Sequence, residues 1–314
     1  MDALGGLLDG VRARGAFVLR LSLDPPWSML VHDDAPLTLI CVTSGSAVIA
    51  TESGRLFDLA PGDVALARGV EPYRFATDPD IVPQVVILPG NRCTTGSGED
   101  LRFTMSVGVR TWGNAADGAD RSIICTYDGC SEVSSRLLGA LPGVLVVRAG
   151  ELPTPLIDLL AVEAGRDGPG QEAYLDRLLD LLLMDVLRTW FERAERAPTW
   201  WRAEQDQAVG PALRLIYNNP EHGWTVAELA AAVGNSRAVF ARRFTALVGE
   251  PPIAFLTSWR LAVAADMLRA GDMTIAAIAG RVGYTTAFAL STAFKRAYGV
   301  SPNSYRGRHT AVTG

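Results

Sequence analysis

An internal repeat in the C-terminal third of the chain restricts the fold more than any other feature of the sequence. Three residues of the first copy recur 49 positions later, and three more recur 50 positions later. The pairs are Thr225/Thr274, Ala230/Ala279, Gly234/Gly283, Phe244/Phe294, Gly249/Gly299 and Pro252/Pro302. Six coincidences at nearly one spacing predict two copies of the same supersecondary unit.

Each copy has the local signals of a helix, a tight turn and a second helix. In the first copy, the segment Thr225–Glu228 has the form of a capping box, which opens a helix. Gly234 then permits the left-handed backbone that a tight turn needs, and Ser236 is placed to cap the next helix. The uninterrupted, helix-favouring segment Ala254–Ala270 joins the copies. The sequence therefore predicts two helix-turn-helix units on a stiff connecting helix, which suits successive major-groove segments of DNA.

The helical period separates a buried face from an outward face in each second helix. We expect Phe240, Phe244 and Leu247 to be buried in the first, and Leu290, Phe294 and Tyr298 in the second. The candidates for DNA contact lie on the opposite sides and their flanks: Arg237, Ala238, Ala241, Arg242, Thr245, Thr286, Phe288, Ala289, Thr292, Lys295 and Arg296.

Two of these candidates have side chains that match particular base edges. The forked donors of Arg242 match O6 and N7 of guanine, and Phe288 is apolar yet points outward, as a contact with a thymine methyl group requires. The alternative is that the arginines are ordinary solvated surface. The charge distribution favours DNA: residues 208–314 hold 11 basic and 5 acidic residues, whereas the whole chain has a net charge of −5. Positive charge is concentrated where phosphate would be met.

Residues 211–306 resemble the DNA-binding domain of the AraC/XylS family of bacterial transcription regulators. The motif that carries the resemblance is Phe294-Lys295-Arg296, Gly299, Ser301-Pro302 and Tyr305-Arg306. The resemblance implies promoter DNA and RNA polymerase as partners. It also implies that Ala238, Ala241, Arg242, Phe288 and Thr292 face bases. Because Thr292 replaces an arginine that is frequent in the family, we expect the second recognition helix mainly to grip phosphate and read shape.

The N-terminal part of the chain alternates short apolar runs with Gly, Pro, Asp and Ser clusters, which predicts a β-sandwich or barrel. The predicted strands are Phe17–Leu23, Leu37–Val42, Ala47–Ala50, Val64–Ala67, Val85–Leu88 and Leu101–Val107. With a turn at Pro61-Gly62-Asp63, and with Trp27 and Gly45 upstream, residues 2–150 resemble the cupin-like sensor domain of one group of AraC-type regulators. The predicted fold class is α+β.

Histidine content bears on whether this domain is an enzyme. The chain has three histidines, of which only His32 lies in the predicted barrel, and Tyr73 stands after Pro72, where related domains often carry histidine. We therefore expect no metal site, no cofactor and no catalytic residue. What remains is the binding of an unidentified small molecule. The candidates for lining its pocket, each of which is alternatively plain core, are Trp27, Met29, Cys41, Tyr73 and Phe75.

The cysteines raise a second hypothesis. Cys93, Cys125 and Cys130 lie near polar, glycine-bearing stretches, and this clustering motivates a thiol-based redox switch. The spacing of Cys125 and Cys130 matches neither a redox-active pair nor a common zinc pair. Free thiols are the ordinary state in a reducing cytoplasm.

The chain divides into a sensor domain (1–150), a helical dimerisation segment and linker (151–207) and a DNA-binding domain (208–314). The segment Gln171–Ala194 is predicted to be a helix with a wide apolar face, which must be covered and favours a homodimer. The segment Ala197–Gln207, with Trp200 and Trp201, is expected to be the linker. No apolar run is long enough to span a membrane, so we expect a cytoplasmic protein.

The sequence thus predicts a ligand-responsive transcription regulator that binds DNA through two helix-turn-helix units. Three alternatives remain at this stage: a regulator switched by cysteine thiols, a catalytic cupin fused to a DNA-binding module, and an architectural DNA-binding protein that responds to nothing.

Overall fold

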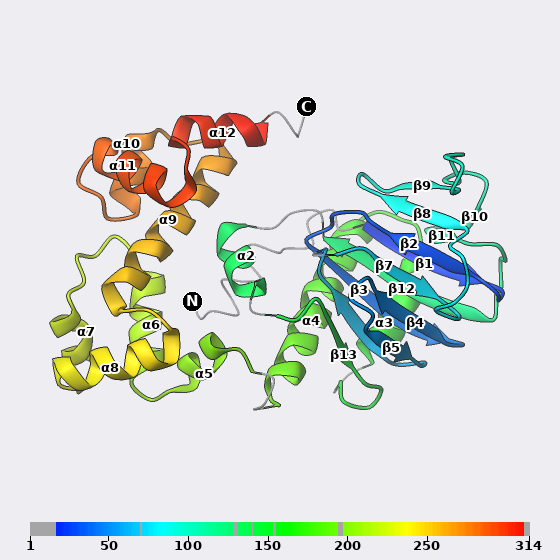
Figure 1. Cartoon of the computed structure of the whole chain (residues 1–314), viewed down its shortest axis with the longest axis horizontal. Coiled ribbons are helices and arrows are strands. Elements are labelled where there is room, and N and C mark those ends of the chain that lie inside the picture. The colour runs from blue at the N-terminus through cyan, green and yellow to red at the C-terminus, as the bar shows by residue number, and fades with distance from the viewer. Residues whose placement is uncertain are drawn as a thin grey trace. The chain divides into compact units, whose positions relative to one another are not determined.

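The structure, a computed structural model, describes residues 17–69, 71–127, 131–139, 141–152, 155–193 and 197–310. These residues form two compact units (Figure 1). Residues 17–127 and 141–193 form a sheet-rich unit, and residues 197–310 together with 131–139 form a helical unit. The predicted α+β class is confirmed.

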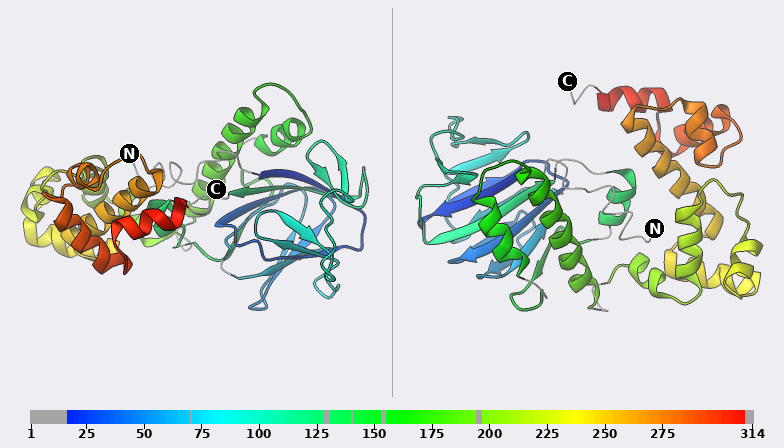
Figure 2. Two further views of the ribbon diagram at one scale, coloured as in Figure 1. Left: turned by 90° about the horizontal axis from the view of Figure 1, so that it is seen from above. Right: turned by 180° about the vertical axis from the view of Figure 1, so that it is seen from behind.

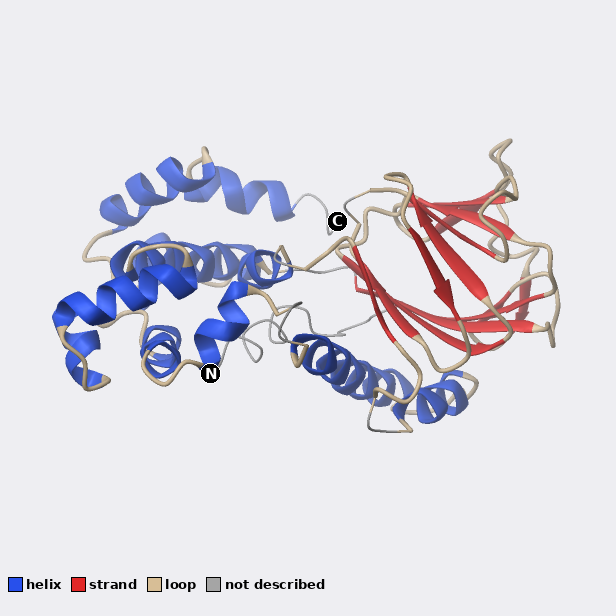
Figure 3. Cartoon of the chain, turned by 60° about the horizontal axis from the view of Figure 1, so that its bottom comes forward, coloured by secondary structure: helices blue, strands red, loops and turns tan. Residues whose placement is uncertain are grey.

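Two β-sheets form the sheet-rich unit, and Figure 3 shows them facing each other as a sandwich. The seven-stranded sheet has the order β10 (Ser106–Gly108), β11 (Thr111–Trp112), β1 (Phe17–Leu23), β12 (Asp120–Tyr127), β3 (Leu37–Ser44), β6 (Val64–Ala67) and β13 (Val144–Val147). The six-stranded sheet has the order β5 (Leu56–Leu59), β4 (Ala47–Thr51), β7 (Tyr73–Ala76), β2 (Ser28–Val31), β8 (Val85–Leu88) and β9 (Arg92–Thr94).

Strand β3 shows why the apolar runs of this sequence become central strands. It pairs with β12 on one side and with β6 on the other. Ile40 and Val42 point into the core between the sheets, and Cys41 alternates to the other face, where helix α3 (Leu156–Ala164) packs. A strand that is covered on both faces needs apolar residues at successive positions rather than alternate ones.

One predicted strand differs from the structure. The run Leu101–Val107 was predicted to be extended, but its first part forms turns, and strand β10 begins only at Ser106. The reason is tertiary: the turns place Leu101 and Met105 against the core between the sheets, while Phe103 lies 83% exposed. Trp112 fixes this loop by donating its indole N–H to the Leu101 carbonyl oxygen at 3.2 Å.

Two helices cover the outer face of the seven-stranded sheet, α3 and α4 (Gln171–Phe191), as Figure 2 shows. The helix predicted from Gln171 is confirmed and ends three residues earlier than expected. Its buried stripe runs from Leu175 to Phe191 and packs toward the sheet. Tyr127 ties the two layers together by donating its hydroxyl hydrogen to the Leu179 carbonyl oxygen at 3.3 Å.

The helical unit contains α2 and the eight helices from α5 to α12 among the described residues. Their bounds are α2 (Glu132–Leu138), α5 (Thr199–Gln205), α6 (Val209–Asn218), α7 (Val226–Ala232), α8 (Arg237–Val248), α9 (Pro252–Ala270), α10 (Ile275–Arg281), α11 (Ala287–Tyr298) and α12 (Pro302–Thr310). Figure 1 shows α9 running from the α7–α8 pair to the α10–α11 pair. The expected linker at 197–207 contains α5, which packs on α6 and α8. In the described parts of the chain, no helix has both the length and the apolar character needed to cross a membrane.

The capping signals read from the sequence are confirmed in the structure. Thr225 and Glu228 form a reciprocal capping box at the start of α7. Ser236 and Thr274 cap α8 and α10 by accepting hydrogen bonds from backbone N–H groups. Gly234, with φ of +68°, makes the turn between α7 and α8. Two helix-turn-helix units therefore fold as the repeat predicted.

Candidate DNA interface and sandwich cavity

The recognition helices α8 and α11 are held by apolar residues that the helical period predicted to be inside. Phe240 and Phe244 are fully buried under α8, and Leu290 and Phe294 are fully buried under α11. Phe294 also stacks on Tyr298, with ring centroids 4.5 Å apart. Because one face of each helix is fixed in this way, the opposite face is presented at a defined orientation.

The outward face of α8 is exposed and carries basic charge. Arg237, Ala238, Arg242 and Thr245 are exposed, whereas Ala241 is half-buried. Among the described residues, Arg242 has no hydrogen-bond or ion-pair partner, so its guanidinium group is available to a ligand. The structure thus presents these five sequence candidates on one helix and leaves the arginine fork open.

Arg243, the next residue, is also exposed but is already engaged. Its Nε and Nη2 atoms donate to Asp206 Oδ2 at 2.9 and 2.7 Å. The Asp206 carboxylate also accepts the N–H groups of Ala208 and Val209 at the start of α6. Burial acts to raise the pKa of Asp206, but these backbone hydrogen bonds and Arg243 hold it below its ordinary value. Arg243 therefore fastens α8 to the start of α6.

The outward face of α11 differs in chemistry from that of α8. Phe288 is 81% exposed, and Thr292, Lys295 and Arg296 are exposed as well. Ala289 is half-buried. Single exposed apolar side chains are ordinary on protein surfaces, so this exposure shows only that the ring is accessible to a partner.

Thr286, another candidate for DNA contact, has a structural role in the described chain. Its Oγ1 accepts a hydrogen bond from the N–H of Ala289 at 3.1 Å and so caps α11. This bond engages one acceptor position of the hydroxyl and leaves its hydrogen free to donate.

Arg260 of α9, which the sequence did not single out, joins the two helix-turn-helix units. Its Nε donates to the Pro220 carbonyl oxygen at 2.6 Å, and its Nη2 donates to the His222 carbonyl oxygen at 2.8 Å. A Cβ at Gly283 would lie 2.6 Å from this guanidinium group, and Gly283 also has a φ of +79°. The turn of the second unit therefore requires glycine for two reasons, and no local signal could have named Arg260 as the cause of one.

A cavity lies between the two sheets of the sandwich. It opens to solvent, and its accessible volume is about 70 Å³. Its wall is mainly apolar, with a few polar side chains: Phe17, Leu19, Leu21, Met29, Val31, Asp33, Thr38, Ile40, Tyr73, Phe75, Ile87, Asn91, Cys93, Trp112, Ile124 and Thr126. We call this space the sandwich cavity. Its composition is typical of a site for a small molecule.

The structure brings together three of the five candidates for ligand contact, Met29, Tyr73 and Phe75, in the wall of the sandwich cavity. Trp27 lines an adjoining cavity that shares Met29 and Trp112 with the first. It also donates its indole N–H to Asp120 Oδ2 at 2.8 Å. Cys41 is fully buried on the opposite face of β3, away from both cavity walls.

Sequence reasoning missed other parts of the wall, including Trp112, Thr38 and Ile87. The alternation of β3 and β8 could have pointed to Thr38 and Ile87. Trp112 stands on a two-residue strand between loops, and such a strand has no period to detect.

The described thiols lie in two different environments. Cys41 and Cys125 are buried, and burial raises the pKa of both well above the ordinary value. Cys93 is half-buried in the cavity wall, where burial also raises its pKa. Cys130 lies outside the described residues. Because the thiolate is the reactive form, these environments disfavour oxidation of the described cysteines, and the redox switch stays a prediction. Nowhere in the described ranges do three or more His, Cys, Asp or Glu side chains form a group that could hold a metal ion.

Two helix-turn-helix units on one connecting helix, with exposed basic recognition faces, define a DNA-binding protein. Comparison with known families agrees: residues 229–308 match the helix-turn-helix domain family, and residues 2–192 match the cupin family.

Full-length relatives give the family. The chain is 30% identical to an AraC-like transcription regulator of Streptomyces antibioticus, with 98% of each chain covered. It is 27% identical to the transcriptional regulator AlkR of Acinetobacter baylyi, with 98% of this chain and 99% of the relative covered. It is 25% identical to the RCS-specific transcriptional activator RclR of Escherichia coli, with 98% of each covered. The chain belongs to the AraC-type transcription regulators and carries a cupin domain at its N-terminal end.

Proposed function

We propose that this regulator responds to a small, largely apolar and uncharged molecule that binds in the sandwich cavity. The observation that carries the proposal is the apolar wall of the cavity, to which side chains from both sheets contribute. An apolar wall that carries a few polar groups is typical of a site for a small molecule.

The polar side chains of the wall restrict the chemistry of the ligand. Burial raises the pKa of Tyr73, so its phenol is neutral and can donate or accept one hydrogen bond. Asp33 and Asn91 lie at the same wall. An anionic ligand would meet the Asp33 carboxylate, and any charged group would lose its hydration among apolar neighbours. An apolar body with one neutral polar end fits this wall.

The experiment that tests this proposal uses the fluorescent, neutral and apolar probe N-phenyl-1-naphthylamine on the full chain. Ile87→Trp on β8 fills the cavity, because Ile87 lines it. Val86→Trp is the matched control, since Val86 alternates to the other face of β8 and is not in the wall. We expect the wild type and Val86→Trp to bind the probe and Ile87→Trp to lose most of the binding. Equal binding by all three proteins would overturn the proposal.

For DNA we propose that α8 reads bases mainly through Arg242. We propose that α11 contributes Phe288 to a thymine methyl group and Lys295 and Arg296 to phosphate. The support is the exposure of these side chains on the faces opposite the buried aromatic residues. The bidentate geometry of arginine suits guanine, and the ammonium of Lys295 suits phosphate as a point charge.

We propose that the protein works as a homodimer formed through α3 and α4. Four large apolar side chains on these helices are exposed, at i,i+3 and i,i+7 spacing: Leu159, Val162, Tyr174 and Leu181. Side chains at these spacings lie on one face of a helix. A second copy would present the same apolar face, which a two-fold interface requires.

The remaining parts of the proposal follow from the role of a transcription regulator. Promoter DNA and RNA polymerase are the macromolecular partners, and the cytoplasm of a bacterium is where they meet. The curated relatives are named as transcription regulators. We propose accordingly that the cupin domain binds its ligand without catalysing a reaction.

A further inference from the structure

Helix α2 belongs to one part of the chain by sequence and to another by packing. In the sequence it lies between β12 and β13, two strands of the seven-stranded sheet. In the structure it packs against α9 and groups with the helical unit that carries the helix-turn-helix pair. A short helix from the middle of the sensor region thus packs as part of the DNA-binding region.

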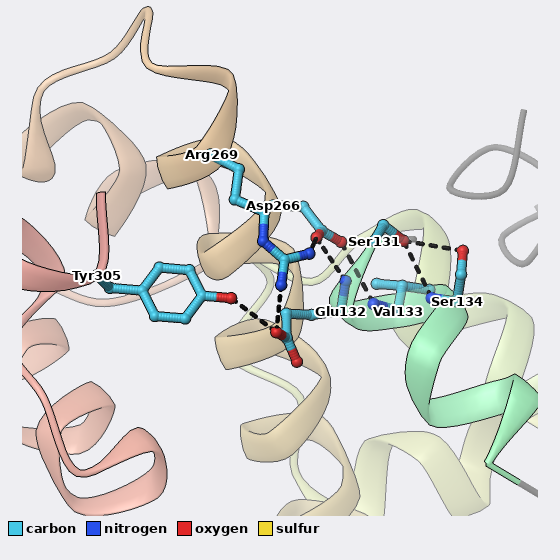
Figure 4. Close-up of polar contacts among 7 residues, drawn as sticks. All are labelled: Ser131, Glu132, Val133, Ser134, Asp266, Arg269 and Tyr305. Atoms are coloured by element: carbon cyan, nitrogen blue, oxygen red, sulfur yellow. Dashed lines mark hydrogen bonds and ion pairs between the residues drawn. The ribbon is translucent and has the colours of Figure 1, made fainter. Parts of the chain in front are cut away.

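The start of α2 is capped by a residue of α9. Asp266 accepts the backbone N–H of Glu132 at 2.7 Å through Oδ1 and that of Val133 at 3.3 Å through Oδ2, as Figure 4 shows. The α2 residues also cap themselves, because Ser131 Oγ accepts the N–H of Ser134 at 3.0 Å. A seven-residue helix is too short to be stable alone, so it depends on such partners.

The side chain of Glu132 connects α2 to two further residues of the helical unit. Its Oε1 accepts a hydrogen bond from Arg269 Nη2 at 2.6 Å and another from the Tyr305 hydroxyl at 2.6 Å. The Arg269 guanidinium carbon lies 5.6 Å from the Tyr305 ring centroid. Figure 4 shows Arg269 from α9 and Tyr305 from α12 converging on this carboxylate.

Tyr305 is part of the core of the second helix-turn-helix unit. It is buried, and its ring lies 5.3 Å from that of Phe294, the residue that holds α11 in place. Glu132 is therefore linked to the recognition helix α11 through Tyr305, which contacts Phe294. The contacts of α2 are on α9 and α12, while the DNA-facing residue Phe288 on α11 stays exposed.

The strand that leads into α2 forms part of the sandwich cavity. Ile124 and Thr126 of β12 line the cavity, and four residues separate Tyr127, where β12 ends, from Glu132, where α2 begins. A tether this short limits how far one end can move without moving the other. A cavity wall and a DNA-unit contact thus lie within one segment of the chain.

We propose that α2 is a latch that couples the sandwich cavity to the second helix-turn-helix unit. The latch consists of Glu132 on α2 with Asp266, Arg269 and Tyr305. A ligand that holds Ile124 and Thr126 in a new position shifts the start of α2 and changes the equilibrium between latched and released states. In the latched and released states, the contacts that support α11 through Tyr305 then differ. This regulation rests on the proposed ligand site, but the latch itself acts whether or not that ligand is known.

Coupling between two binding sites is reciprocal. If a ligand in the cavity changes the affinity for DNA, the binding of DNA must also change the cavity wall. The experiment is hydrogen exchange with mass spectrometry on the full chain, with and without a duplex of about 30 base pairs selected by the wild-type protein, which spans two major-groove segments. Peptides covering 120–127 report on β12, and peptides covering 132–138 report on α2. Asp266→Ala removes the cap, and Glu132→Gln weakens the latch more mildly. Asp272→Asn, an exposed carboxylate just after α9, is the matched control.

In the wild type we expect DNA to change the exchange rate of β12 by about twofold or more. Asp266→Ala should abolish this change and speed exchange in α2 by about tenfold, the loss expected for charge-assisted hydrogen bonds. It should still bind the duplex, and Asp272→Asn should behave as the wild type. If the response of β12 persists in Asp266→Ala and Glu132→Gln, or is missing in the wild type, the latch is refuted. If the wild type fails to bind the fluorescent probe but β12 still responds to DNA, the ligand site is refuted and the latch is not.

Discussion

The neighbouring arginines of α8 allow the proposed base contact of Arg242 to be separated from the structural contact of Arg243. Arg242 is exposed and has no hydrogen-bond or ion-pair partner in the described parts of the chain, whereas Arg243 holds Asp206 through two hydrogen bonds. The two residues have the same charge and lie on the same helix. Their alanine variants therefore remove the same charge from the same surface and differ only in what the side chain touches.

The structure gives a different expected loss for each variant. A bidentate contact with guanine is worth about 1–3 kcal/mol of discrimination, so Arg242→Ala should weaken binding to selected DNA by about 5- to 150-fold. Protein stability should change by less than about 0.5 kcal/mol, because no hydrogen bond or ion pair among the described residues is lost. Arg243→Ala should lower the free energy of unfolding by about 0.5–1 kcal/mol, since its ion pair with Asp206 is half-exposed.

Fluorescence anisotropy at several salt concentrations, on selected and on random duplexes, measures the first effect. Chemical denaturation measures the second. Arg242→Ala should lose affinity for selected DNA and keep its affinity for random DNA. An equal loss on both duplexes, with a salt slope reduced by about one, would make Arg242 a phosphate contact and refute the reasoning. A loss of specificity in Arg243→Ala as large as in Arg242→Ala would show that the ion pair with Asp206 opens on DNA.

Three further predictions concern other parts of the molecule. Burial acts to raise the pKa of Asp63, but two backbone N–H groups and Arg148 lower it below its ordinary value, so its contribution to stability is present above a pH of about 4 and is lost below. Asp63→Asn should therefore lower the free energy of unfolding by about 1–3 kcal/mol at pH 7. Urea denaturation should show that the difference in this free energy between variant and wild type becomes smaller as the pH falls. Phe288→Ala should leave the melting temperature unchanged but weaken DNA binding; unchanged affinity would show that the ring touches no base. Leu181→Glu should shift the protein to monomers in light scattering, and a persistent dimer would place the interface elsewhere.

Local chemistry in the sequence determined the two helix-turn-helix units. A capping box, a glycine that accepts a positive φ and a buried aromatic pair are each decided within one turn or two of the chain. The repeat then supplied the second copy. The same holds for strands that are bounded by turn residues. The predicted bounds of β6 and β8 are the bounds that the structure shows.

The tertiary structure decided what depends on residues far apart in the chain. The sequence presented Cys41 as a candidate for the pocket, but only the pairing of β3 decides that it faces helix α3 instead of the cavity. Leu101 lies in a turn rather than a strand because Trp112 and the core hold it there. Helix α2 joins the helical unit because Asp266, 134 positions away from Glu132, accepts its first N–H group. Periodicity and capping describe neighbours along the chain, whereas these contacts join groups that only folding brings together.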